Sequence, residues 1–585
     1  MSSEGKVDVC SIPSTGQRWL SKNLRISSRR NLHLAAWSLL ALACCFLAYT
    51  ARMHEITHDA FHEMSLFRES LVLGSFPTSD VFAYTPTVDP SVHHEWGTGA
   101  ILYFATVGSG LGLLGLSLLK LLLMAALWLM LYRVARMRGA HPILFACMSL
   151  IVFPLLWVGF ATVRAQLFTL VFIAVQLWMQ ELDWRGRRAW VLPWLAMLIL
   201  WLNLHAGFVV GLGMVAFHTL ERIVASVHRG RLSGLSRFGQ TMAQVLRDTW
   251  HLFLLAPAAV MALPLNPYGW KYIPYLIHAI SMPRPLIREW KPIWHTYAPV
   301  WTILALLVAL ALFAYAQRCN PLRRLRGAAF LALAAYMSVK HIRHGSIFAV
   351  TWIAFVPAWI SRTALGKQLV QKLESNQPKV VRVCQATAVL TMTFALANHF
   401  WLPSMPPAPL YSTACYPTGA VEFLKEHHFR GNLMTPFHVG AYVSWELFPS
   451  TRVSFDGRYE VAYQPQVMEE HNRFLGGEDN WWTVVDKYPT DAILVHKQAP
   501  VHDRLVTLLT RDKVTGEQRD VPENLVGWYV AYCDDSFSII AGPHIRLPQV
   551  HRIGQPMQDG AWKAFSSEHA HWNHRRSLSV SAVLP

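Results

Sequence analysis

The sequence predicts an α-helical polytopic membrane protein with a small α/β domain near its C-terminal end. Of its 585 residues, 53% are hydrophobic and only 15% are charged, which is too apolar for an ordinary soluble protein. The apolar residues gather in long runs, and residues 31–50 alone are long enough to cross roughly 30 Å of hydrocarbon as a helix. After Trp401 the composition becomes that of a soluble module.

Eleven apolar segments are predicted to span the membrane. The first has neither the short apolar core nor the small-residue cleavage site of a removable signal peptide, so we expect it to remain as a helix. These segments and their loops form a predicted transmembrane domain over residues 31–403, with the first outer loop at 51–97. The predicted spans are residues 31–50 and about 111–132, 142–161, 165–182, 189–203, 207–225, 251–266, 298–316, 327–340, 345–361 and 384–402.

Basic residues mark alternate ends of these spans. Residues 1–30 carry six Lys and Arg, and each even-numbered span is followed by a basic stretch such as "DWRGRR" (183–188). Because cytoplasmic loops of membrane proteins carry the excess of Lys and Arg, we expect the tail 1–30 in the cytoplasm and the C-terminal region outside it. This topology accounts for the formal net charge of +17 without a nucleic-acid partner.

The soluble part follows a Pro-rich linker at residues 404–410. Within residues 411–547 the apolar runs "TRVSF", "DAILV", "WYVAYC" and "FSIIAG" predict strands between helical stretches, and Pro417-Thr418 can open a helix. The polar tail 548–585 is expected to be disordered. Cys415 and Cys533 lie beyond the last span, and both a disulfide between them and two buried free thiols remain open.

The first outer loop concentrates carboxylates and histidines. Seven acids lie between residues 51 and 97, and on a helix Asp59, His62 and Glu63 would share one face. Asp80, His94 and Glu95 return to the same outer side of the membrane. An aspartate at this place could deprotonate a hydroxyl or amine that attacks an activated sugar. The alternative is a solvated acidic loop without a chemical role.

A metal-site pattern overlaps the same loop. "HEITH" (54–58) matches H-E-x-x-H, which on a helix places two His ligands on one face with Glu as general base. No third carboxylate ligand is evident, so a zinc hydrolase is the lesser alternative, and we assign no metal ligands.

Several bases lie on the outer side, against the general pattern of charge. Either they are anchors at the lipid headgroups, or they form a pocket for a phosphate group, whose oxygens the planar guanidinium of Arg binds in pairs. "WLNLHAGF" (201–208) interrupts an apolar stretch with polar residues, which is tolerated where the backbone lines a cavity. The candidate ligand-binding residues here are Arg164, Asn203, His205, Arg288, Lys340, Arg343 and His344.

The order of these motifs resembles that of bacterial multipass glycosyltransferases of the GT-C superfamily, over most of the chain. The resemblance rests on "HDAFHEMSLFRESLVLGSFPTSDVFAYT", "HHEWGTGAILYF", "NLHAGF", "NPYGWKY", "IREWKP", "KHIRHGSIFAV" and a C-terminal stretch that contains "FDGRY". It implies an enzyme of the bacterial inner membrane, with a GT-C-like transmembrane domain. Such an enzyme moves a sugar from a polyprenyl-phosphate donor to an extracytoplasmic glycan, lipid or protein acceptor, usually with inversion.

The resemblance also implies roles for residues. A first-loop carboxylate acts as general base, and Asp59 is the best match. Similar proteins often have Asp, two aromatic residues and His, where this chain reads Asp59-Ala60-Phe61-His62, so Glu63 stays a second candidate. By the same likeness Asp80 and Glu95 orient the acceptor or a metal. Arg343 and His344 hold the lipid phosphate, Asn203 and His205 line the pocket, and a divalent cation, Mg²⁺ or Mn²⁺, remains open as cofactor.

Two interpretations without catalysis compete with this one. A transporter would share the apolar spans, but transporters often contain internal repeats and midplane charges, and neither is evident here. A catalytically silent membrane scaffold would use the outer domain for interactions, and the departure at Ala60 from the similar proteins would fit such a loss of activity.

Overall fold

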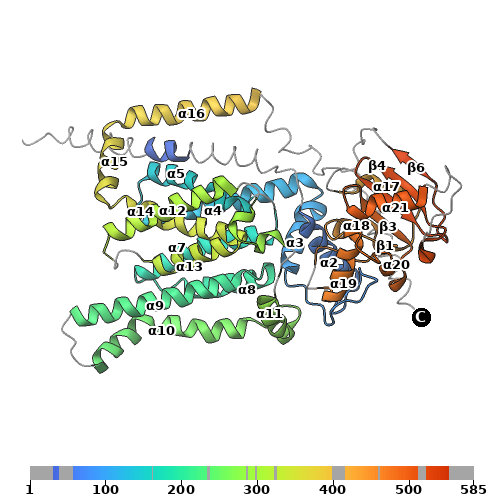
Figure 1. The fold of residues 1–585 in the computed structure, drawn as a ribbon. Coiled ribbons are helices and arrows are strands. Elements are labelled where there is room, and N and C mark those ends of the chain that lie inside the picture. Colours follow the sequence, from blue (N-terminus) through green and yellow to red (C-terminus); the bar gives the residue numbers. More distant parts are fainter. Residues whose placement is uncertain are drawn as a thin grey trace, which may run out of the picture.

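The computed structural model shows a bundle of helices joined end-on to a mixed α/β domain (Figure 1). The helices α2 (His58–Leu73) and α3 (Trp96–Tyr103) lie between the two parts. The structure describes residues 31–37, 57–160, 163–232, 238–282, 284, 287–296, 299–321, 326–397, 416–458, 462–510 and 522–552.

Four helices of the described residues are long and apolar enough to cross a membrane, which indicates a membrane protein. A fifth span results if the helical segments Ile342–Ile360 and Ala364–Ser375, which meet at 84°, are counted as one broken span. The prediction of eleven spans is therefore too high for this part of the chain. The four helices are α4 (Leu113–Met137), α7 (Ala165–Trp184), α9 (Phe208–Leu232) and α12 (Pro299–Cys319).

Three of the predicted spans that are not among these helices are short or broken. The segment 142–161 forms α5 (Pro142–Ile151) and α6 (Phe153–Phe160), because Pro154 cannot donate the backbone hydrogen bond that would continue the first helix. The segments 189–203 and 327–340 form α8 (Val191–Leu204) and α13 (Ala328–Lys340), which are shorter than the roughly 20 residues that a span needs. Of the first predicted span, residues 38–50 lie outside the described residues.

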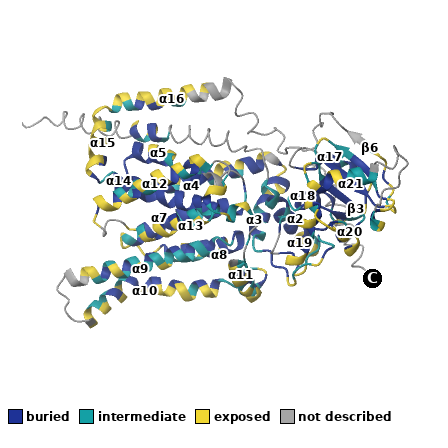
Figure 2. Ribbon diagram, in the orientation of Figure 1, coloured by how far each residue is buried: buried dark blue, intermediate teal, exposed yellow. Residues whose placement is uncertain are grey.

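Helix α14 (Gly345–Ile360) forms the centre of the bundle, and all of its residues are buried (Figure 2). It packs against α4, α6, α7 and α13, so a helix that is apolar on every side is buried in protein on every side. Apolar side chains on α10 are instead exposed, including Phe253, Leu254 and Met261, as expected of a face turned to lipid. The remaining elements here are α10 (Phe238–Ala262), η2 (Gly269–Lys271), α11 (Tyr272–Ser281), η3 (Arg288–Trp290), η4 (Ile293–His295), η6 (Ile342–His344), α15 (Ala364–Ser375) and α16 (Gln377–Ala397).

The C-terminal domain contains a six-stranded sheet in the order β2-β1-β3-β5-β4-β6. β1 is parallel to β2 and β3, β5 is antiparallel to β3 and β4, and β6 is parallel to β4. The strands are β1 (Gly431–Met434), β2 (Thr451–Val453), β3 (Ala492–His496), β4 (Tyr529–Asp534), β5 (Phe537–Ala541) and β6 (Val550–Arg552). The helices are α17 (Thr418–Glu426), α18 (Gly440–Leu447), α19 (Pro465–Gly476), α20 (Thr483–Lys487), α21 (Pro500–Thr510) and η10 (Glu523–Leu525).

The four predicted strand runs are confirmed as β2, β3, β4 and β5, and α17 begins at the predicted Thr418. β6 extends the folded domain slightly past the predicted boundary at residue 547. Cys415, the linker 404–410 and residues 553–585 lie outside the described residues. The thiol of Cys533 lies 3.5 Å from the Ser538 hydroxyl.

The first outer loop holds the two parts together. Phe61 and Met64 of α2 belong to the same hydrophobic core as Tyr442 and Trp445 of α18. Further along the loop, Ala83 and Thr87 form bridges with residues of the C-terminal domain. The loop therefore places its carboxylates at the junction of bundle and domain.

Candidate functional site

The carboxylate of Asp59 faces the guanidinium of Arg164, a residue about a hundred positions later in the chain. Asp59 is on the first turn of α2, and one carboxylate oxygen lies 3.9 Å from a terminal nitrogen of Arg164, the residue before α7. The Asp59 side chain is 42% exposed, so a small reactant can reach it. A first-loop acid and a later base, which the sequence analysis placed on one side of a membrane, thus lie side by side.

The surroundings of Asp59 raise its pKa to about 6. The main cause is that the surrounding protein limits hydration of the carboxylate, although part of the side chain is exposed. Glu95 and Glu289 push the pKa further up, whereas Arg164 and Arg343 pull it down. A carboxylate with a pKa this close to neutrality is both ionised at pH 7 and basic enough to accept a proton.

A pair of carboxyl groups lies one helical turn away. Glu63 is 2% exposed, and its carboxyl group interacts directly with that of Glu95. Burial and this neighbour raise the pKa of Glu63 well above its ordinary value. The pKa of Glu63 is raised and that of Glu95 is lowered, so Glu63 is the member of the pair that retains a proton more readily.

Two histidines favour the ionised form of the Glu95 carboxyl group. Burial alone would raise the pKa of Glu95, but His94 and His205 lower it. Their Nε2 atoms lie 3.3 and 3.5 Å from one Glu95 oxygen. Nδ1 of His205 accepts the backbone N–H of Gly207, so the neutral ring carries its proton on Nε2, toward Glu95. The hydroxyl of Tyr275 lies 2.7 Å from Nδ1 of His94.

Arg164 connects this acidic group to the basic segments. It binds Glu289 of η3 at 2.7 Å and the amide oxygen of Gln166 at 2.8 Å. The Gln166 amide in turn donates to the backbone oxygen of Arg343. The sequence analysis missed Glu289 and Gln166, although "IREWKP" was among the motifs that carried the resemblance.

Trp290 supports two more guanidinium groups. Arg343 and Arg284 lie over its ring at 4.8 and 4.7 Å from the centroid, a cation–π arrangement. The rings of His344 and His341 pack edge-on against the same Trp. Arg343 and His344 therefore lie together, beside the group that contains Arg164.

Glycines bring the helices close enough for these contacts. A Cβ on Gly99 of α3 would lie 2.2 Å from the backbone oxygen of Glu63, and one on Gly97 would lie 2.7 Å from that of Asn203. At Gly207 it would meet His205 and Thr169 at 2.5 Å. The glycines of "HHEWGTGAILYF" and "NLHAGF" are thus required for packing at the site.

Some predicted residues have other positions. Asp80 forms a buried ion pair with Arg458 of the C-terminal domain, which also binds Asp456. The side chain of Asn203 is engaged in positioning: it accepts the indole N–H of Trp96 at 2.8 Å and donates to two backbone oxygens. Asp80 and Asn203 therefore join the elements that surround the site.

The remaining candidates lie at or outside its edge. Burial is the main reason that the pKa of His62 is lowered to about 3. The charge of Arg458 also lowers this pKa, whereas that of Glu95 raises it. Arg288 is exposed and donates to the backbone oxygen of His295. Lys340 is exposed too, with its ammonium over the ring of Tyr336.

The H-E-x-x-H pattern is only partly described. His54 and Glu55 lie outside the described residues, and His58 packs against the ring of Tyr416 at 4.7 Å. Among the residues that the structure describes, no three His, Cys, Asp or Glu side chains are arranged to hold a metal ion.

One region of the structure contains an accessible carboxylate with a raised pKa, a buried pair of interacting carboxyl groups, and several guanidinium groups. Such a region can remove a proton from one reactant while positive charge stabilises an anion on another. No protein-family model matches this chain, and no curated protein matches it significantly in sequence.

Proposed function

We propose that the protein is a membrane glycosyltransferase that moves a sugar from a polyprenyl-phosphate donor to an acceptor on the extracytoplasmic side of the bacterial inner membrane. The observation that supports this most is the approach of Asp59 to Arg164, with Arg343 close enough to affect the Asp59 pKa. General base and phosphate-binding group are the two functions that such a transfer needs.

Asp59 is the proposed base. Its ionised carboxylate takes the proton of an acceptor hydroxyl or amine while the acceptor atom attacks the anomeric carbon. The bond from that carbon to the phosphate oxygen breaks, and polyprenyl phosphate leaves with the electron pair. Attack from the face opposite the phosphate inverts the anomeric centre.

Arg164 and Arg343 are the proposed partners of the phosphate. Negative charge grows on the departing phosphate, and guanidinium groups that are already oriented stabilise it without further rearrangement. Glu289 holds Arg164 at 2.7 Å, and Trp290 supports Arg343 from one side. Arg164 is only 14% exposed, so water screens its charge little.

Glu63 has a different proposed role. It is 2% exposed, so a reactant cannot reach its carboxyl group as it can reach that of Asp59, and its pKa is raised well above the ordinary value. Its proton stabilises Glu95, and Glu95 in turn orients His94 and His205. Asp59 is therefore favoured over Glu63 as the base.

The test uses purified full-length protein and a labelled polyprenyl-phosphate sugar. Wild-type protein should release free lipid phosphate in the presence of an acceptor, and Asp59→Asn should release it at least about a hundredfold more slowly. Asp89→Asn is the matched control, because Asp89 is an exposed acid of the same loop. A transporter or a scaffold would release no lipid phosphate, and near-normal turnover by Asp59→Asn would refute the role of Asp59.

A further inference from the structure

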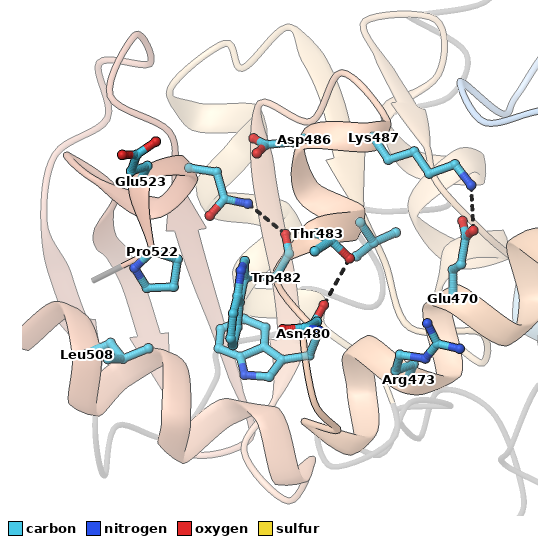
Figure 3. Close-up of a pocket in the computed structure, with 13 residues that line it drawn as sticks. Glu470, Arg473, Asn480, Trp482, Thr483, Asp486, Lys487, Leu508, Pro522 and Glu523 are labelled. Carbon is cyan, nitrogen blue, oxygen red and sulfur yellow. Dashed lines mark hydrogen bonds and ion pairs between the residues drawn. The ribbon is translucent and has the colours of Figure 1, made fainter. Parts of the chain in front are cut away.

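The C-terminal domain contains an open hollow that shares no residue with the charged group around Asp59 (Figure 3). Its volume is about 1050 Å³, which is at the upper end for small-ligand sites. Residues of α19, α20, α21 and η10 and of the loop before α20 line it. The proposed transfer chemistry does not use this hollow.

A turn of unusual backbone presents a tryptophan to the hollow. Gly477 ends α19 with φ at 61°, and Asn480 has φ at 59°, a conformation that Asn tolerates better than most residues. The turn sends Trp481 into the core, 3% exposed and edge-on to Phe474. Trp482 follows with its ring 5.7 Å from that of Trp481, packs against the same core and stays only half-buried. Trp481 is thus fixed in the core, and Trp482, which rests edge-on against it, keeps part of its indole accessible in the hollow.

Hydrogen-bonding groups surround this indole. The Asn524 side chain donates to the backbone oxygen of Trp482 at 2.9 Å, while its own amide oxygen is buried without a donor among the described residues. Figure 3 shows Glu523 and Pro522 on one side of Trp482, and Glu470, Lys487 and Arg473 on the other. A polar ligand can therefore be held from two sides.

The charges of the lining nearly cancel. Among the described residues it has three carboxylates, on Glu470, Asp486 and Glu523, against two cations, on Arg473 and Lys487. Lys487 already pairs with Glu470, which also accepts the hydroxyl of Tyr488. An excess of carboxylates disfavours phosphorylated or polyanionic ligands and leaves a neutral, hydroxyl-rich one.

A peptide fits this place less well than a saccharide. Peptides commonly extend the edge of a sheet or lay an apolar helix into an apolar groove. The edge strands β2 and β6 contribute no residue to the lining, and charged side chains divide its apolar part. A sugar ring instead has a C–H face that packs on the negative face of an indole, and hydroxyls that both donate to carboxylates and amide oxygens and accept from amides and cations.

We propose that this hollow is a binding site for a neutral oligosaccharide, with Trp482 as the stacking platform. Binding here involves no reaction, so it can be measured whether or not the protein transfers sugar. If the transferase proposal is correct, the site would hold part of a glycan acceptor or product.

The test is binding to the full-length protein in phospholipid nanodiscs, because detergents with sugar headgroups would compete. The probes are neutral oligosaccharides (cellohexaose, mannohexaose, maltohexaose and chitohexaose), hexagalacturonate as an anionic sugar, and a mixture of uncharged hexapeptides. At least one neutral sugar should bind, and Trp482→Ala should weaken that binding by about tenfold or more. Trp294→Ala is the control, since Trp294 is 56% exposed and outside the hollow.

A second variant tests the proposal independently in case Trp482→Ala does not fold. Asp486 and Glu523 are exposed, so Asp486→Ala with Glu523→Ala should fold and still weaken binding of the same sugar. Failure of every neutral sugar to bind, binding of only hexagalacturonate or the peptides, or unchanged binding by folded Trp482→Ala would each overturn the proposal. None of these outcomes bears on release of lipid phosphate, so the two proposals fail separately.

Discussion

Glu63 of α2 and Glu95, the residue before α3, bring two carboxyl groups into direct contact. Two ionised carboxylates that interact in a buried place repel each other, which favours a state in which the pair shares one proton. His94 and His205 flank Glu95, and the raised pKa therefore falls on Glu63. Of the two carboxyl groups, Glu63 is therefore the proton donor and Glu95 is the anion.

Glu63→Gln imitates the protonated state of this residue. The amide can still donate to Glu95, so the variant should fold as well as wild type. An acid whose pKa is raised on folding loses stability as pH rises from its ordinary value, near 4.3, toward the raised one. Gln has no such loss, and thermal unfolding at about pH 7.5 should occur at the same or a higher temperature than in wild type.

The same variant separates the two candidate bases. If Asp59 is the base, Glu63→Gln should keep lipid-phosphate release within about tenfold of wild type, because only a positioning group changes. Glu63→Ala is the contrasting variant, since it leaves the buried Glu95 without its donor. Loss of turnover in a stable Glu63→Gln protein would move the role of base from Asp59 to Glu63.

The pKa of Asp59 predicts a pH dependence of activity. The base must be ionised, and its pKa is raised to about 6. Turnover should therefore be nearly constant above about pH 7 and fall about tenfold per unit below about pH 5.5. The measurement is initial release of lipid phosphate at saturating donor across this range. If turnover instead began to fall only near pH 4, Asp59 would not be the group whose ionisation limits activity.

Arg164 should affect the departure of the phosphate. Arg164→Ala removes positive charge from a poorly hydrated place, and loss of one such preorganised group lowers turnover by about 10²–10³-fold. Arg164→Lys keeps the charge but not the planar fork, so an intermediate loss is expected. Arg288→Ala is the control because Arg288 is exposed. Equal effects of Arg164→Ala and Arg288→Ala would contradict a specific role of Arg164.

The sequence predicted the C-terminal sheet better than the membrane helices. Runs such as "DAILV" have the length and β-branched content of a buried strand, and such local signals identified four of the six strands, whereas β1 and β6 were not predicted. Hydropathy does not distinguish burial in lipid from burial in protein, and α8 and α13 are apolar yet too short to span. Pro154 marks the break between α5 and α6, a signal that the count of apolar segments overlooked.

The candidate site was predictable in part for a similar reason. Alternation of charge placed Asp59 and Arg164 on one side of the membrane, and the structure brings them to 3.9 Å. The contact of Glu63 with Glu95 depends on how α3 packs on α2, which no local pattern specifies. Glu289 was overlooked because it stands between Arg288 and Lys291, in a segment that was interpreted only by its positive charge.

Packing of α3 on α2 should be the point at which the site is most easily disturbed. A Cβ at Gly99 would lie 2.2 Å from the backbone oxygen of Glu63, and a backbone atom cannot move aside as the end of a side chain can. Gly99→Ala should therefore separate the two helices and destabilise the protein by about 1–3 kcal/mol or more. Because Glu63 and Glu95 would move apart, transfer should fall along with stability.

Gly213→Ala is the matched control for this prediction. Gly213 lies in α9, and a Cβ there would meet no atom within 4 Å. Since Ala favours a helix by up to about 1 kcal/mol over Gly, that variant should unfold at the same or a higher temperature. Thermal unfolding and lipid-phosphate release are measured on both proteins in the same nanodiscs. If Gly99→Ala matched Gly213→Ala in both measurements, close contact of α2 and α3 would not be what holds the carboxyl pair together.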